Sequence, residues 1–169
     1  MIRVIGIDPG SEHCGVVVID ATPKEHLDEM PWYTTEILIT EFTPLELYDF
    51  LEAEKGTDVY IAYEAFHLYP WQAQRRAFST FPEAEVIGTL KYICVQKFTE
   101  ANILAVKPGD HKHFRPGFIR SRIHTIKNSH IRDAYSVAIW VLAFKLLPTN
   151  LMENGEVDKD LSKIYIHTK

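Results

Sequence analysis

The stretch GIDPGSEHCGVVVID, residues 6–20, places an acidic side chain at the end of a strongly apolar segment. Residues 2–8 have the composition of a buried β-strand, but this strand ends on Asp8. A Pro-Gly turn follows, and residues 13–20 are again rich in β-branched residues, so the two segments predict a β-hairpin. Because burying a carboxylate costs free energy, Asp8 needs either a partner within the fold or a function.

The rest of the chain alternates between strand and helix patterns. Apolar runs and helical spacing predict strands at 32–40, 58–66 and 103–107, and helices from Pro44 to about Lys55, at 83–98 and at 130–147. Thr43 is expected to cap the first helix and Asn128 or Ser129 the last. The order βββαβαβα predicts an α/β domain over residues 1–148, with a mixed five-stranded sheet, an antiparallel hairpin start and helices on both faces. Residues 149–169 form a polar tail, with a short strand predicted at KIYIH, residues 163–167.

The composition bounds the class of protein. The 169 residues are 46% apolar and 24% charged, which suits one globular domain with a substantial core. We find no run of the roughly 18 apolar residues that a membrane helix needs, and we expect a cytoplasmic protein without a membrane partner. Cys14 and Cys94 both lie in apolar segments, and we expect them to be reduced core residues.

A basic segment stands out from the acidic remainder of the chain. The net charge is −5, but residues 107–132 contain seven Lys and Arg residues and a single acid, Asp110. The basic residues are Lys107, Lys112, Arg115, Arg120, Arg122, Lys127 and Arg132. Such a stripe is typical of a nucleic-acid-binding surface, and the alternative is a solvated loop in which charges cluster by chance.

Two further acids belong with Asp8. Glu64 lies at the end of an apolar strand, and Asp133 lies in the first predicted turn of the last helix, on the same face as His130. Each of the four residues has an ordinary structural explanation on its own. Asp8 can cap a turn, and Glu64 can be an exposed strand end. Asp133 can interact with the helix dipole, and His130 can form a hydrogen bond with Asp133. Strand ends and helix starts meet at one edge of an α/β sheet, however, and three carboxylates there repel one another unless cations offset them. Oxygen ligands beside a histidine favour Mg²⁺ or Mn²⁺, and two such ions suit phosphodiester cleavage.

The segments GIDPGSEHCGVVVID, IAYEAF and HIRDAYSVAIW resemble the RuvC family of Holliday-junction resolvases, within the RNase H-like fold, over residues 2–146. The first motif is shared with other nuclease-like families and with actin-like ATPases, whereas the ordered set of four residues is more specific. The resemblance implies that Asp8, Glu64, His130 and Asp133 are catalytic and bind two metal ions per site. Some members have aspartate where this chain has His130. It also implies a homodimer that resolves four-way junctions in branched DNA by paired nicks.

The resemblance extends to residues that contact DNA or a second subunit. Lys107 falls where the family has a DNA-facing lysine, and Lys112 is a looser match. Gly88 matches a small residue of the helix that packs in the dimer, with contact between helix and sheet as the alternative. Phe66 or Tyr69 can serve as the aromatic residue that the family places just beyond the glutamate, facing the junction.

The segment between Glu64 and Gly88 departs from the family because it is longer and richer in aromatic residues. Arg75 and Arg76 are interleaved with these aromatics, a pattern that suits stacking against bases. Phe78 and Phe81 are expected instead in a small satellite core. A compact, divergent chain of this kind is often phage-encoded, so the expected cell is a bacterium or a phage-infected host.

Three other functions remain open from the sequence. An actin-like or sugar-kinase-like ATPase shares the opening turn, but the chain has room for only one of the two lobes that such enzymes need. A branched-DNA-binding module could keep the fold without catalysis. A nuclease acting on other branched DNA or on RNA–DNA hybrids is the strongest alternative, because the fold does not determine the substrate.

Overall fold

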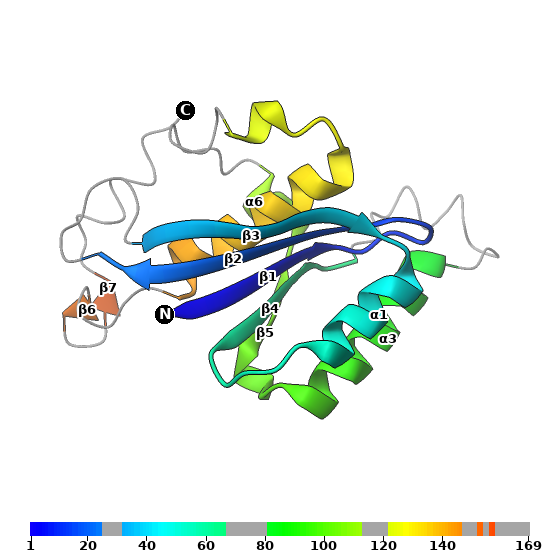
Figure 1. Ribbon diagram of the computed structural model, residues 1–169, viewed down its shortest axis with the longest axis horizontal. Coiled ribbons are helices and arrows are strands. Elements are labelled where there is room, and N and C mark those ends of the chain that lie inside the picture. The colour runs from blue at the N-terminus through cyan, green and yellow to red at the C-terminus, as the bar shows by residue number, and fades with distance from the viewer. Residues whose placement is uncertain (25–31, 67–80, 113–121, 147–151, 154–155, 158–169) are drawn as a thin grey trace.

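The computed structural model describes residues 1–24, 32–66, 81–112, 122–146, 152–153 and 156–157 (Figure 1). At its centre is a five-stranded sheet in the order β3-β2-β1-β4-β5. Its strands are β1 (Ile2–Asp8), β2 (Cys14–Pro23), β3 (Trp32–Phe42), β4 (Val59–Glu64) and β5 (Ile103–Val106). Pairing is antiparallel from β1 to β2 and from β2 to β3, and parallel from β1 to β4 and from β4 to β5. The predicted mixed sheet with a hairpin start is therefore confirmed.

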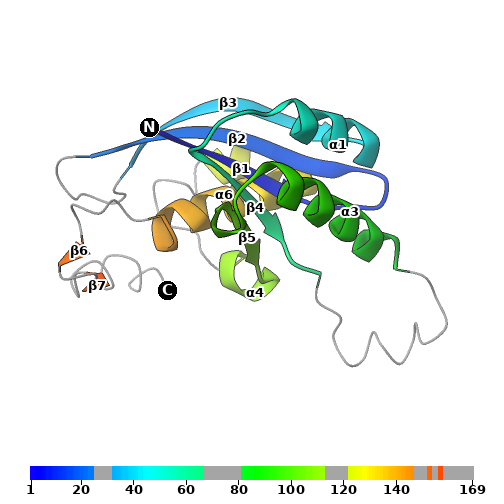
Figure 2. The same ribbon diagram turned by 90° about the horizontal axis from the view of Figure 1, so that it is seen from below.

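Helices cover both faces of this sheet, as predicted (Figure 2). The helices α1 (Pro44–Ala53) and α3 (Pro82–Lys97) lie together on one face, and α6 (Ser129–Phe144) crosses the other. Each face has its own apolar core, one built around α6 and the other around α1 and α3. The result is a three-layer α/β fold in which β1, the middle strand, is enclosed on both sides.

Local sequence signals explain where the helices begin. Thr43 and Glu46 form a capping box at the start of α1, with Pro44 in the first helical position. At α6, the Asn128 side chain accepts a hydrogen bond from the backbone N–H of Ile131. The helix ends were predicted too late. Instead of continuing to about Lys55 and Leu147, α1 ends at Ala53 and α6 at Phe144.

Short elements complete the fold. The helical turns η1 (Glu100–Asn102) and α4 (Pro108–His111) flank β5, and neither was predicted. A small hairpin of β6 (Met152–Glu153) and β7 (Glu156–Val157) falls in the predicted tail, whereas the strand predicted at 163–167 lies outside the described residues. Both Cys14 and Cys94 are free and buried, as predicted. Among the described residues, no helix is long and apolar enough to cross a membrane.

Two glycines let α6 approach the sheet closely. A Cβ atom at Gly6 of β1 would collide with the carbonyl oxygen of Ala134 and the side chain of Ala138. A Cβ atom at Gly15 of β2 would collide with the backbone of His130. The absence of side chains at these two positions therefore sets how closely the first turns of α6 lie against the ends of β1 and β2.

Candidate active site

The alternation of side chains along the strands directs the two strand-end acids toward α6. On β1, Val4 packs in the core around α6, while Ile5 and Ile7 pack on the opposite face. Asp8 has the same parity as Val4, so it points to the α6 side. The same argument applies to Glu64, because Ala62 packs in the core around α6. Parallel pairing of β1 with β4 then places both acids at the same edge of the sheet.

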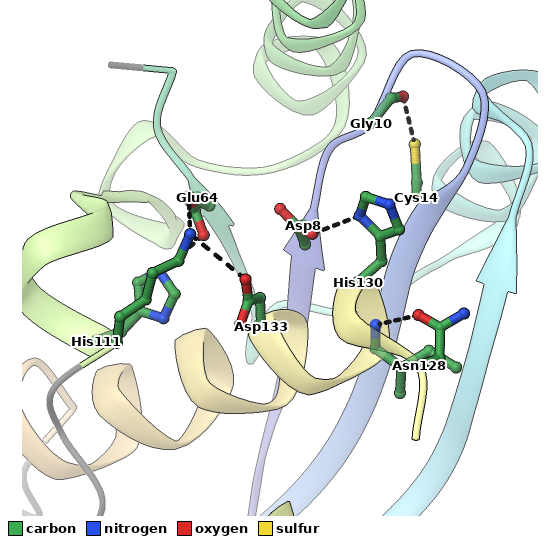
Figure 3. A network of polar contacts seen from close by, with 10 residues as sticks. Asp8, Gly10, Cys14, Glu64, His111, Asn128, His130 and Asp133 are labelled. Carbon is green, nitrogen blue, oxygen red and sulfur yellow. Dashed lines mark hydrogen bonds and ion pairs between the residues drawn. The ribbon is translucent and has the colours of Figure 1, made fainter. Parts of the chain in front are cut away.

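Asp133 enters this space from α6, and Figure 3 shows it close to Glu64 and on the same side as Asp8. It is the fifth residue of α6, and so lies in the second turn rather than the first turn as predicted, because the helix begins at Ser129. Burial raises the pKa of Asp8 from its ordinary value of 3.8 to about 6, against the opposing hydrogen bond from His130. The negative charges of Glu64 and Asp133 add to this increase, so the three carboxylates share one electrostatic environment.

His130 is the partner of Asp8. Its Nδ1 atom lies 2.7 Å from Oδ2 of Asp8. His130 is the second residue of α6, held in place by the Asn128 cap on one side and by the contact of its backbone with Gly15 on the other. The structure thus brings all four sequence-predicted residues to one edge of the sheet, with histidine bound to a carboxylate.

Two residues of the segment after β5 contact Glu64. His111 is fully buried, and its Nε2 atom lies 2.9 Å from Oε2 of Glu64. Lys112 follows, and its Nζ atom lies 3.0 Å from Oε1 of Glu64 and 3.4 Å from Oδ2 of Asp133. Burial raises the pKa of Glu64, but the hydrogen bonds from His111 and Lys112 outweigh it, so the net shift is downward.

His111 was not identified as a site residue from the sequence, although its position in the chain indicates that it lies near Glu64. It lies just beyond the carboxyl end of β5, and β5 runs parallel to β4 as its neighbour. A residue that follows β5 is therefore expected beside one that ends β4. Because an ionised carboxylate only accepts hydrogen bonds, Nε2 of His111 carries the proton toward Glu64. No described residue is a hydrogen-bond partner for the buried Nδ1 atom of His111.

The donor set suits a divalent cation in kind, because carboxylate oxygens are the ligands that Mg²⁺ and Mn²⁺ prefer. Within the described ranges, however, no three His, Cys, Asp or Glu side chains are grouped closely enough to hold one metal ion. The carboxylates are engaged with nitrogen atoms instead: Asp8 with His130, and Glu64 and Asp133 with Lys112. The ammonium between Glu64 and Asp133 indicates that this space accommodates a positive charge.

The predicted DNA contacts fall into several groups. Lys107 and Lys127 are exposed near the same edge of the sheet, at the end of β5 and just before α6. Arg122 is paired with Glu36 of β3, with Nη2 2.5 Å from Oε2, so its charge is already offset within the protein. The remaining basic and aromatic candidates outside the described residues are Arg115, Arg120, Tyr69, Arg75 and Arg76.

Phe66 and Gly88 are the other candidates that the structure describes. Phe66 is partly exposed just beyond Glu64, and it contacts Phe81 edge-to-face with 5.7 Å between ring centroids. Gly88 is exposed on α3, and a Cβ atom there would meet nothing within 4 Å. The alternative that Gly88 serves a contact between helix and sheet is therefore wrong. Tyr92 and Val95, at helical spacing from Gly88, are 68% and 61% exposed on this helix.

Comparisons with known proteins agree with the architecture. A search of protein-family models and a search of curated proteins both find no match. Among solved structures, the chain is similar to one described as RuvC of Thermus thermophilus and to one described as that RuvC in complex with a Holliday junction substrate. Both have a TM-score of 0.56 and cover 82% of this chain and 92% of the other, at 15% and 13% identity respectively. The chain therefore has the RuvC-like, RNase H-like fold that the sequence predicted.

Proposed function

We propose that this protein is a metal-dependent endonuclease that cleaves four-way DNA junctions. The observation that carries the proposal is the convergence of Asp8, Glu64 and Asp133, from two strand ends and one helix, on a single edge of a RuvC-like sheet. The cleavage would proceed in the cytoplasm as hydrolysis of a phosphodiester. The similarity to a RuvC described in complex with a Holliday junction favours a branched substrate.

The three carboxylates would hold two Mg²⁺ or Mn²⁺ ions. Asp8 would hold both ions, and Glu64 and Asp133 would each hold one. Such ions would activate water and stabilise the leaving oxygen. His130 would orient Asp8 through the existing hydrogen bond, or turn from it to become a ligand or to accept a proton from the attacking water.

Binding of DNA would rest on the basic residues around this edge. Lys107 and Lys127 are exposed there, and the segment 113–121 adds Arg115 and Arg120 from the sequence. Phe66, Tyr69, Arg75 and Arg76 would contact unstacked bases beyond Glu64. Paired nicks need two sites, and we propose a homodimer through the exposed face of α3, with Gly88, Tyr92 and Val95 at its centre.

A substrate panel with a matched active-site variant tests this function. Labelled four-way junctions, flaps, duplexes and RNA–DNA hybrids are incubated with the protein in Mg²⁺ and in Mn²⁺. We expect symmetric nicks in the junction alone, and we expect Asp8→Asn to bind the junction without cleaving it. Preferential cleavage of flaps or hybrids would assign the alternative nuclease function, and binding of junctions without cleavage by the wild type would assign a non-catalytic module. Cleavage that survives Asp8→Asn would contradict the proposed site.

A further inference from the structure

Lys112 occupies a position that no role in DNA contact explains. Its Nζ atom lies 3.0 Å from Glu64 and 3.4 Å from Asp133, and so joins two carboxylates that come from different elements. The side chain is 42% exposed, whereas Glu64 is 13% and Asp133 27% exposed. The ammonium thus contacts both acids, although the Lys112 side chain as a whole remains partly exposed to solvent.

The backbone of Lys112 is fixed although its side chain is not enclosed. Its N–H donates to the carbonyl oxygen of Pro108, the first residue of α4, and so caps the end of this helix. The preceding residue, His111, is fully buried and held by Glu64. A lysine stem has four rotatable carbon–carbon bonds, so the ammonium can leave the two acids by side-chain rotation while α4 stays in place.

The electrostatics of the site explain why a cation is needed between these acids. Asp8, Glu64 and Asp133 lie close enough together for the charges of the last two to raise the pKa of the first. Burial lowers the pKa of Lys112, but the contacts with Glu64 and Asp133 outweigh it, so the ammonium stays charged. Without a metal ion, the Lys112 ammonium is a positive charge that offsets this repulsion by its contacts with Glu64 and Asp133.

A metal ion and Lys112 would compete for the same carboxylate oxygens. Mg²⁺ binds carboxylate oxygens at roughly 2.0–2.1 Å and demands a near-octahedral arrangement, whereas an ammonium needs hydrogen-bond distances of about 3 Å. Two cations of this kind repel each other strongly in a half-buried site. Glu64 and Asp133 therefore cannot keep both the ammonium and the ion that they are proposed to hold.

We propose that Lys112 is a built-in counter-ion, which occupies the space between Glu64 and Asp133 in the metal-free protein and is displaced when a divalent cation binds there. This inference rests on the proposed function, because it takes these two acids as metal ligands. Lys112 then stabilises the metal-free fold and weakens the affinity for metal by the same interaction.

Calorimetric titration of the full chain with Mn²⁺ and with Mg²⁺, without DNA, tests the displacement. We expect Lys112→Met to bind the ion about five- to tenfold more tightly than the wild type, the effect of removing two competing ion pairs. Lys112→Arg keeps the charge and should bind as weakly as the wild type. Lys107→Met removes a nearby exposed charge that contacts neither acid in the described structure, and it should change the affinity less than twofold.

Thermal unfolding of the same variants gives a second measurement. In EDTA, Lys112→Met should unfold at a lower temperature than the wild type, and at saturating Mn²⁺ the difference should disappear. An unchanged or weaker affinity for the metal, or a difference in unfolding temperature that persists with metal, would overturn the counter-ion role while leaving the nuclease proposal intact. If neither the wild type nor Lys112→Met binds either ion, both the inference and the proposed function fail.

Discussion

His130 Nδ1 lies 2.7 Å from Asp8 Oδ2, although 122 residues separate the two in the sequence. This contact joins the end of the central strand β1 to the start of α6, the helix that covers one face of the sheet. The hydrogen bond opposes the effect of burial on Asp8 but does not cancel it, since the pKa of Asp8 is still raised to about 6. The folded protein therefore carries a destabilising acid in its candidate active site.

The first prediction concerns how much the buried Asp8 carboxylate lowers the free energy of unfolding. Between the ordinary pKa of 3.8 and about 6, the folded protein holds a proton on Asp8 that the unfolded chain has released. The free energy of unfolding therefore falls as pH rises through this window. Asp8→Asn should be more stable than the wild type in EDTA at pH 7, by about 3 kcal/mol. Urea unfolding from pH 4 to pH 7 measures the difference, which should vanish at the acid end; a less stable variant at pH 7 would contradict it.

The second prediction concerns the buried His111. Its hydrogen bond helps hold the pKa of Glu64 below the ordinary value of 4.5. Such a contact stabilises the protein above that pH and is lost as pH falls through the lowered pKa. His111→Leu should lower the free energy of unfolding by about 1–3 kcal/mol at neutral pH, and His111→Gln, whose amide can donate to Glu64, by less. Urea unfolding over a series of decreasing pH values checks this, and a loss that never shrinks on acidification would exclude the contact with ionised Glu64 as its cause.

The third prediction compares two glycines. Gly15→Ala forces a methyl group against the backbone of His130, which cannot move without shifting α6, and should destabilise the protein by about 3 kcal/mol. Gly88→Ala places the methyl group in open space within a helix and should stabilise the chain by about 0.5–1 kcal/mol. Chemical denaturation of the two variants measures both effects. Equal effects would show that α6 does not approach β2 as closely as described.

Gly88→Ala also bears on the proposed dimer. If the exposed face of α3 is the interface, the added methyl group should weaken self-association even as it stabilises each helix. Sedimentation of the variant and the wild type at several concentrations separates these effects. A variant that associates as the wild type does would place the interface elsewhere.

The fourth prediction concerns the salt dependence of junction binding. Lys107 is exposed and should contact a phosphate, so Lys107→Gln should reduce the slope of log K against log salt by about 0.9. Arg122 is already paired with Glu36, so Arg122→Gln should change the slope much less. Glu36→Gln releases Arg122 and should steepen the slope. Anisotropy titrations in the Asp8→Asn background measure all three, and equal effects of the two basic substitutions would show that Arg122 leaves Glu36 for DNA.

The fold was predictable because its signals are local. Apolar runs of strand length, the Thr43–Glu46 capping box and the Asn128 cap each depend on a few neighbouring residues. The helix ends were less predictable, because an apolar pattern continues past Phe144 although the helix does not. The four-residue helix α4 is too short to have a periodic pattern, so it was missed.

The candidate site was predictable only in part. Asp8 and Glu64 interrupt apolar strands, so their positions stand out from the pattern of the sequence alone. The sequence groups Lys112 with its basic neighbours as a DNA-binding residue, because a charge pattern indicates only the sign of each side-chain charge and not which side chain it contacts. Its contacts with Glu64 and Asp133 depend on how β4, α4 and α6 come together, and no local pattern records this.

The direction of β1 also has a practical consequence. Met1 is exposed at one end of this strand and Asp8 ends the other, seven strand residues later (Figure 1). At about 3.3 Å per residue, the two lie roughly 20 Å apart. A fluorophore or a surface tether attached at residue 1 is thus held away from the candidate active site, which suits the immobilised protein to single-molecule recording.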